Sequence, residues 1–258
     1  VGDPTRAAVN RGLADYTPIF LSQVPDLFHR RHVDIDAALI QTSLPDRHGY
    51  LNLGVSVDIV KAAVACASLV VAQVNPRMPR VPGDGFLHVD EVDYLVECDE
   101  PLLEYQPNVP DEVAARIGRY VARIGQDGDT IQVGYGSVPN AIMAALGRKK
   151  HLGLHSELLT DGIVDLVRRG VVDNSRKSIN RGKSVASFAM GSAAMDEFLD
   201  GNPAIELRTI DYTNNPLVIA QHAGMTAINS ALEVDLTGQA SAESIGRTFY
   251  SGIGGQAD

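Results

Sequence analysis

The sequence predicts an α/β protein whose sheets are mainly parallel. Short runs rich in Val and Ile alternate with helix-like segments along almost the whole chain. The apolar runs are bounded by Gly, Pro, Asn or Asp, which is typical of strands. This alternation favours parallel sheets, because a helix can carry the chain back between two parallel strands. The 258 residues fit one large domain or two of ordinary size.

The first half of the chain contains four predicted elements before a break. These are strands over 33–41, 68–75 and 92–97 and a helix over 57–66. A stretch from Gln106 to Pro110 then interrupts the pattern, because two closely spaced prolines disfavour a helix. We therefore expect a domain boundary near residue 108, with one domain over 1–107 and a second over 108–258.

The second half begins with a helix for which Asp111 is the expected N-cap. Val113, Ile117, Val121 and Ile124 recur in it at helical spacing, so we expect these four side chains to be buried. Alternation then continues to the end of the chain. The expected helices lie over 139–146, 163–169 and 193–199, and the expected strands over 130–134, 151–154, 184–190, 205–209, 225–229 and 232–236.

Composition excludes several function classes. A net charge of −10 argues against a broad nucleic-acid surface, although a few local cations and N–H groups can still hold the phosphates of an anionic ligand. The sequence contains no run of about 18 apolar residues, so it predicts no membrane-spanning helix. Cys66 and Cys98 are expected to be free thiols in a cytoplasmic protein. The seven histidines show no metal-ligand spacing, so we expect no metal site.

A possible anion site follows the strand predicted over 130–134. Gly134 and Gly136 lead into a helix whose first residue is expected to be Pro139. Backbone N–H groups at such a helix start can bind a phosphate. The segment is also similar to a dinucleotide fingerprint, but Pro139 replaces the third glycine. A tight turn without a ligand explains these residues equally well.

Glu157 is the leading candidate for a catalytic residue. It follows a short apolar run, at the carboxyl end of an expected strand, where ligand sites of α/β sheets are found. Most glutamates are solvated surface residues, which is the alternative. Two distant segments could complete a site: the Asn-Asn-Pro turn at 214–216 and the glycine-rich stretch at 251–256. Together these segments favour covalent catalysis by a carboxylate on a thioester.

These motifs, in this order, resemble the acetyl-CoA hydrolase/4-hydroxybutyrate CoA-transferase family, of class I type. The resemblance covers essentially the whole chain and rests on residues 45–56, 72–75 with 78–79, 132–139, 153–162, 214–219 and 251–256. It implies a NagB/RpiA/CoA-transferase-like fold of two α/β domains with the active site between them. Members of the family run longer at both ends, so both domains are expected to be incomplete. Residues 1–107 would be the later part of the first domain, and 108–258 the first part of the second.

The resemblance also implies roles for individual residues. Glu157 matches the nucleophile, and Asn215 and Gly255 match positions that stabilise the oxyanion. Five further residues would line the region that binds the acyl group and the CoA thioester: Gly134, Gly136, Gly252, Gly254 and Gln256. No permanently bound cofactor is implied, because coenzyme A enters as part of an acyl-CoA substrate. The other expected partners are a short-chain carboxylate and further copies of the chain, in a homodimer or larger homo-oligomer.

The activity that the resemblance implies is transfer of CoA from an acyl-CoA to a free carboxylate, such as acetate, butyrate or 4-hydroxybutyrate. The reaction would proceed through a glutamyl-CoA thioester. Acetyl-CoA hydrolysis is the alternative, because water could resolve the same covalent intermediate. A nicotinamide-binding protein resting on Gly134 and Gly136, and a non-catalytic α/β domain, are more distant alternatives.

Overall fold

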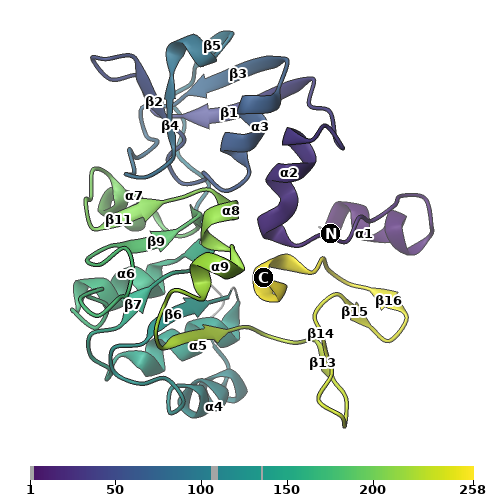
Figure 1. The fold of residues 1–258 in the computed structure, drawn as a ribbon, viewed down its shortest axis with the longest axis vertical. Helices are drawn as coiled ribbons and strands as arrows, with labels where there is room; N and C mark the ends of the chain where they lie inside the picture. The colour runs from purple at the N-terminus through teal and green to yellow at the C-terminus, as the bar shows by residue number, and fades with distance from the viewer. Residues whose placement is uncertain (1–2, 106–109, 135) are drawn as a thin grey trace.

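The chain forms two lobes, and each lobe carries a parallel sheet (Figure 1). The computed structural model describes residues 3–105, 110–134 and 136–258. Residues 37–97 form the lobe at the top of Figure 1, most of the second half forms the lobe below it, and the N-terminal helix lies at the right beside the C-terminal hairpins. Within the described ranges, no helix combines the length and apolar character needed to cross a bilayer.

The sheet of the first lobe consists of three strands that pair in parallel in the order β1–β3–β5. Their bounds are β1 Ala37–Thr42, β3 Leu69–Val74 and β5 Tyr94–Glu97. Side chains of β3 alternate between buried and half-buried, so that Val70, Ala72 and Val74 face the core. The other elements of the first half of the chain are helices α1 Asp3–Asn10, α2 Val24–His29 and α3 Val60–Cys66, 3-10 helices η1 Leu21–Gln23 and η2 Val89–Glu91, and the antiparallel strands β2 Tyr50–Asn52 and β4 Phe86–His88. Of these, α1 packs beside β16 near the end of the chain.

The strands of the second lobe are mostly short. They are β6 Thr130–Val133, β7 Gly153–Leu154, β8 Leu158–Leu159, β9 Ser184–Ala186, β10 Phe188–Ala189, β11 Ile205–Leu207 and β12 Met225–Ile228. The parallel order β12–β6–β7 is extended by an isolated parallel bridge between His155 and Val185, which links β7 to the parallel pair β9–β11. Strands β8 and β10 form a second, separate parallel pair.

Helices and hairpins complete the second lobe. The helices are α4 Glu112–Val121, α5 Ser137–Leu146, α6 Asp161–Arg168, α7 Ala193–Leu199, α8 Ile210–Thr213, α9 Pro216–Ile219 and the 3-10 helix η3 Gly254–Ala257. Two antiparallel hairpins project beside them: β13 Glu233–Val234 with β14 Ala240–Ser241, and β15 Ser244–Ile245 with β16 Thr248–Phe249. The predicted fold class, α/β with mainly parallel sheets, is confirmed.

The strand predicted over 184–190 was wrong, because it is two strands, β9 and β10, with different partners. The change of partner occurs at Ser187. Its N–H donates to the carbonyl of Glu157 at 2.8 Å, and its carbonyl accepts from the N–H of Val57 at 3.1 Å. Those bonds direct the backbone away from β11 and toward the loop that carries Glu157.

The buried face predicted for α4 was also wrong, although Asp111 does cap the helix by accepting from the N–H of Ala114 at 2.7 Å. The residues expected in the core are exposed or half-buried: Val113, Ile117, Val121 and Ile124. The face that packs on α5 instead carries Ala114 and Gly118. A Cβ at Gly118 would lie only 2.6 Å from the carbonyl oxygen of Ala141, so the two helices are in backbone contact.

Two other predicted elements begin or pair differently. Helix α5 starts at Ser137, so Pro139 is its third residue and not its first. The strand predicted over 232–236 is the short, exposed strand β13 of an antiparallel hairpin. Gly238, at the turn of that hairpin, has a φ of 89°, which favours glycine.

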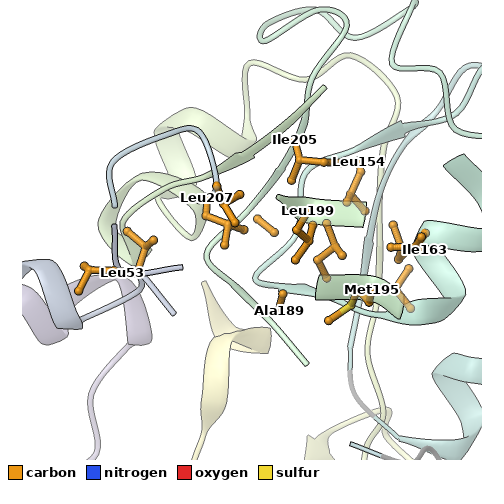
Figure 2. Close-up of a cluster of buried hydrophobic side chains, with 14 of the residues drawn as sticks. Leu53, Leu154, Ile163, Ala189, Met195, Leu199, Ile205 and Leu207 are labelled. Carbon is orange, nitrogen blue, oxygen red and sulfur yellow. The ribbon is translucent and has the colours of Figure 1, made fainter. Parts of the chain in front are cut away.

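The two halves of the chain share one hydrophobic core. Figure 2 shows buried side chains that run from Leu53 in the first half to Leu207 and Leu199 in the second. Backbone bonds accompany this contact, since the N–H of Leu207 donates to the carbonyl of Pro82 at 2.8 Å. The boundary predicted near residue 108 lies in 106–109, outside the described residues.

Candidate active site

Glu157 lies on the segment between β7 and β8, as expected for a residue that follows a strand. Its carbonyl accepts from the N–H of Ser187 at 2.8 Å, which fixes the segment against the loop between β9 and β10. His155 and Ser156 before it are both 1% exposed. These two polar side chains are therefore buried supports of the Glu157 segment.

The Glu157 carboxylate is half-buried, and it lies near two other carboxylates. Burial raises the pKa of Glu157, because the ionised form loses water. A hydrogen bond from Asn214 opposes this shift, whereas the charges of Asp258 and Asp58 raise the pKa further. A raised pKa strengthens the carboxylate as a base and nucleophile once it is ionised.

Asn214, and not the predicted Asn215, is the amide that contacts Glu157. Its Nδ2 donates to Oε2 of Glu157 at 3.3 Å and to Oδ2 of Asp258 at 3.2 Å. The predicted residue, Asn215, instead caps α9, because its side chain accepts from the N–H of Leu217 at 2.9 Å. Pro216 was the signal, since proline favours the first turn of a helix and makes the preceding residue the N-cap. A proline at position 216 therefore assigns Asn215 to the helix cap and leaves Asn214 as the amide that is available to the site.

Two buried hydroxyl groups support Asn214 from behind. Ser187 and Thr213 share a hydrogen bond between their hydroxyls, and Thr213 Oγ1 donates to Oδ1 of Asn214 at 3.2 Å. The carbonyl of Thr213 accepts from Nε2 of His155 at 2.7 Å. All three supports are almost fully buried. The amide of Asn214 is thereby oriented with its NH₂ group toward the carboxylates.

The glycine-rich segment at 251–256 covers Glu157. A Cβ at Gly255 would overlap both Oε2 of Glu157 and Nδ2 of Asn214, so only glycine allows this approach. Gly252, Gly254 and Gln256 line a cavity of about 500 Å³ together with Gly255 and Glu157. The structure therefore brings the predicted glycine segment to the predicted nucleophile.

The predicted residues near β6 divide between two roles. Gly134 lines the same 500 Å³ cavity, and its N–H donates to the carbonyl of Ile228 at 3.0 Å. Gly136 precedes α5 with a φ of 122°, a conformation that favours glycine, and it is not among the described residues that line the cavity. A second cavity, of about 170 Å³, also has Glu157 and Gly255 in its wall.

A buried basic cluster lies behind the Glu157 segment. The rings of His155 and His222 are 4.6 Å apart, and burial lowers the pKa of each to about 4. Burial also lowers the pKa of Lys177 to about 7, and its Nζ donates to the carbonyls of Leu154 and Lys183. Lys177 and His155 donate to backbone carbonyls around Glu157, whereas neither ring nitrogen of His222 has a hydrogen-bond partner among the described residues. Among the described residues, no three His, Cys, Asp or Glu side chains form a group that could hold a metal ion.

The N-terminal segment fixes the glycine-rich segment from the other side. The hydroxyl of Tyr16 accepts from the N–H of Ile253 at 3.1 Å, and the N–H of Ser22 donates to Oδ1 of Asp258 at 3.2 Å. Residues far apart in the sequence thus complete the site, and the two ends of the chain lie close together in Figure 1.

Comparison with known proteins shows which family the chain resembles. Residues 1–104 match the acetyl-CoA hydrolase/transferase N-terminal domain, and residues 191–258 match the C-terminal domain of the same name. A 4-hydroxybutyrate coenzyme A transferase from Clostridium kluyveri is 48% identical over 258 residues, which are 100% of this chain and 60% of that protein. A succinyl-CoA:acetate/propanoyl-CoA:succinate CoA transferase from Fasciola hepatica is 43% identical, over 100% of this chain and 54% of that protein.

A solved structure is also similar to the chain. The crystal structure of a 4-hydroxybutyrate CoA-transferase from Porphyromonas gingivalis has a TM-score of 0.84 and 39% identity, covering 92% of this chain and 61% of that one. The chain spans about 54% to 60% of the length of the two curated relatives named above. The chain belongs to the acetyl-CoA hydrolase/transferase family.

Proposed function

We propose that the protein transfers CoA between an acyl-CoA and a short-chain carboxylate, with Glu157 as the covalent carrier. The placement of Glu157 carries the proposal. Its carboxylate has a raised pKa and contacts the amide of Asn214. Glu157 also lines two cavities, and Gly255 lies so close to its carboxylate that a side chain at position 255 would overlap it. A solvated structural glutamate would need none of these features. Coenzyme A acts in this scheme as part of the substrate, and no resident cofactor is required.

The chemistry follows from the carboxylate. An oxygen of ionised Glu157 attacks the thioester carbonyl carbon, the C–S bond breaks, and CoA leaves as a thiolate. The product is a mixed anhydride of Glu157 and the acyl group. The thiolate then attacks the Glu157 carbonyl carbon, which releases the free carboxylate and leaves a glutamyl-CoA thioester. A second carboxylate repeats these steps in reverse and departs as the new acyl-CoA.

Asn214 and the backbone at Gly255 stabilise the negative charge in this scheme. Each tetrahedral intermediate carries a negative oxygen, and donors already directed at that position lower the barrier. Asn214 Nδ2 lies 3.3 Å from Oε2 of Glu157, so it can donate to the negative oxygen that forms when Glu157 is acylated. Asn215 serves this role only indirectly, because its side chain caps α9.

The substrate and the acceptor belong to the proposal. We assign acetate, butyrate or 4-hydroxybutyrate as carboxylates, supported by the relative named for 4-hydroxybutyrate and by the acetate in the name of the second relative, which is also named for succinate. Hydrolysis would need water to reach the same intermediate, and the cover formed by the segment at 251–256 favours transfer. We also propose that the protein acts as a homodimer or larger homo-oligomer, which light scattering after size-exclusion chromatography would measure.

The test is the dependence of CoA release on an added carboxylate. The protein at its full natural length is mixed with acetyl-CoA, with and without butyrate, and butyryl-CoA is measured. We expect butyryl-CoA to form only with both substrates, and Glu157→Gln to abolish it. Free CoA released at the same rate without butyrate would instead establish the hydrolase. Equal activity of Glu157→Gln would contradict the carboxylate mechanism.

A further inference from the structure

Glu157 separates two cavities of unequal size. The larger, of about 500 Å³, is bounded by the glycine-rich segment, and the smaller, of about 170 Å³, extends toward α9 and β12. An apolar cavity of about 150 Å³ is known to hold benzene, so the smaller one has room for a short acyl group. It has no room for the long pantetheine arm of coenzyme A, which only the larger cavity can take.

The smaller cavity has an apolar wall. Ile219 contributes to it from the end of α9, and Met225 and Ala227 contribute from β12. Ala227 is exposed despite lying in a paired strand, and its small side chain opens the cavity. Because Ala227 pairs in register with Gln132 of β6, both side chains lie on the same face of the sheet.

Neutral amide groups form another part of the cavity wall. Gln132 Nε2 donates to Oδ1 of Asn229 at 3.1 Å, and Asn229 Nδ2 donates to Oε1 of Gln132 at 3.0 Å. Each amide thus orients the other. The pair also lines the larger cavity, so it stands at the boundary between the two.

The charges around the smaller cavity are negative. Glu157 and Asp258 both line it, and no Lys or Arg is among its described lining residues. A second carboxylate on the acyl group would therefore enter a site with two like charges and no cation. An uncharged acyl group avoids this repulsion.

We propose that the smaller cavity binds the acyl group and selects short, uncharged chains, with Ala227 setting the length that fits. This inference rests on the proposed function, because it places the acyl carbonyl carbon at Glu157. The acyl chain then extends along Ile219, Met225 and Ala227, while the CoA arm leaves through the larger cavity. Acetyl, butyryl and 4-hydroxybutyryl groups fit this description, whereas a succinyl group does not.

Chain length is tested with acetyl-CoA, butyryl-CoA and hexanoyl-CoA as donors and propionate as the common acceptor, in the protein at its full natural length. Ala227→Leu is expected to lower the butyryl-to-acetyl ratio of kcat/KM at least tenfold, roughly the effect of one or two methylenes in a pocket. Ile219→Ala, which enlarges the cavity, is expected to raise the hexanoyl-to-acetyl ratio by about tenfold. Ala220→Leu, the same substitution one residue beyond α9 and outside the described cavity linings, is the control and should leave both ratios unchanged.

Each outcome separates the inference from the proposed function. If wild type transfers CoA but both ratios stay within twofold in Ala227→Leu and Ile219→Ala, the smaller cavity does not hold the acyl group. Misfolding of Ala227→Leu would lower all donors alike, and the gain expected for Ile219→Ala would still decide the question. If wild type transfers CoA to no carboxylate, the proposed function fails and the inference fails with it.

Charge selection is tested separately with Asp258→Asn. This variant is expected to raise the ratio of kcat/KM for succinyl-CoA to that for acetyl-CoA as donors, with propionate as acceptor, by at least about threefold, since it removes one of the two charges that repel a second carboxylate. Both donors react with the same Glu157 carboxylate, so a change in the pKa of Glu157 cancels in the ratio. A ratio that is unchanged or lower would overturn the charge selection.

Discussion

Glu157 lies among groups that shift its pKa in opposite directions. The Asn214 amide stabilises the ionised form, whereas burial and the charge of Asp258 favour the protonated form. Because only the ionised carboxylate is a nucleophile, activity should fall as pH drops through the raised pKa of Glu157. The pH profile of CoA transfer therefore reports directly on the neighbours of this residue.

The two neighbours should move the acidic limb of the kcat/KM profile in opposite directions. Asn214→Ala removes a donor to the carboxylate, so the pKa of Glu157 rises and the limb moves to higher pH. Asp258→Asn removes a like charge, so the limb moves to lower pH. Asn214→Ala should also lower kcat about tenfold or more, as loss of a hydrogen bond to a charged group does. Shifts in the same direction would show that the limb does not belong to Glu157.

Gly255 should tolerate no side chain, because a Cβ there overlaps the Glu157 carboxylate. We expect Gly255→Ala to lower kcat about a hundredfold or more by displacing the nucleophile or its cover. Gly125→Ala is the matched control, since its Cβ would meet only Cδ2 of Leu146, at 3.9 Å. Steady-state kinetics of both variants provide the measurement. Near-normal kcat in Gly255→Ala would mean that the segment does not cover the site during catalysis.

The sequence was enough to single out Glu157 and the glycine segment, because a strand end and a dense run of glycines are visible in one chain. It did not distinguish Asn214 from Asn215. Both amides suit an oxyanion site, and only the start of α9 at Pro216 assigns one of them to a helix cap. The support from Ser187 and Thr213 could not be predicted, because it joins segments that no local pattern relates.

At the scale of elements, α4 carries two stripes at helical spacing. Large apolar side chains such as Val113 and Ile117 form one, and small residues such as Ala114 and Gly118 form the other. Periodicity predicted the helix but could not say which stripe faces α5. Backbone contact with Ala141 selects the small residues, because only they allow the helices to approach so closely.

Gly118→Ala should therefore destabilise the protein even though alanine favours a helix. Its Cβ would lie 2.6 Å from the carbonyl oxygen of Ala141, and overpacking of this kind costs about 1–3 kcal/mol. Val113 lies on the other side of the same helix and is 63% exposed, so Val113→Ala should change the free energy of unfolding by less than about 0.5 kcal/mol. Urea denaturation compares the two variants. A larger loss in Val113→Ala would contradict the packing of α4.

The strand that divides into β9 and β10 shows a similar limit of sequence patterns. A continuous apolar run predicted one strand, but hydrogen bonds to Glu157 and Val57 interrupt it at Ser187. The partner of a strand depends on residues far away in the chain. This division matters for function, because it ties the Glu157 segment to the first lobe.

At the scale of the whole molecule, stability should depend on two buried histidines. The folded-state pKa of His155 and of His222 is about 4, below the ordinary value of 6.5. Between these values the unfolded chain binds more protons than the folded one, so stability is lost as pH falls through this window. The free energy of unfolding should thus decrease from pH 7 to pH 5, as measured by denaturant titration at each pH.

His222→Phe should make that decrease smaller, because the ring stays in place and one titrating group is removed. The neighbouring His155 remains, so part of the pH dependence should persist. The free energy of unfolding is compared between pH 7 and pH 5 within each protein. A change in packing alters both values alike, whereas loss of a titrating group alters their difference. An identical difference in wild type and variant would show that His222 does not contribute.

The two lobes and both ends of the chain meet around one site. Leu53 and Leu207 belong to one core that spans both halves, and Tyr16 and Ser22 hold the segment that covers Glu157. The alternation of strands and helices predicted an α/β fold with mainly parallel sheets in both halves. It could not predict their contact, because the bridge between Gly83 and Leu207 pairs residues that lie 124 positions apart.

The central claim is that Glu157 carries the CoA group during the reaction. The most direct measurement is peptide mass spectrometry after incubation with acetyl-CoA and treatment with borohydride or hydroxylamine. We expect reduction or a hydroxamate on the peptide that contains Glu157, and no modification in Glu157→Ala. CoA transfer by the protein at its full natural length without modification of Glu157, or with modification of another residue, would contradict the claim.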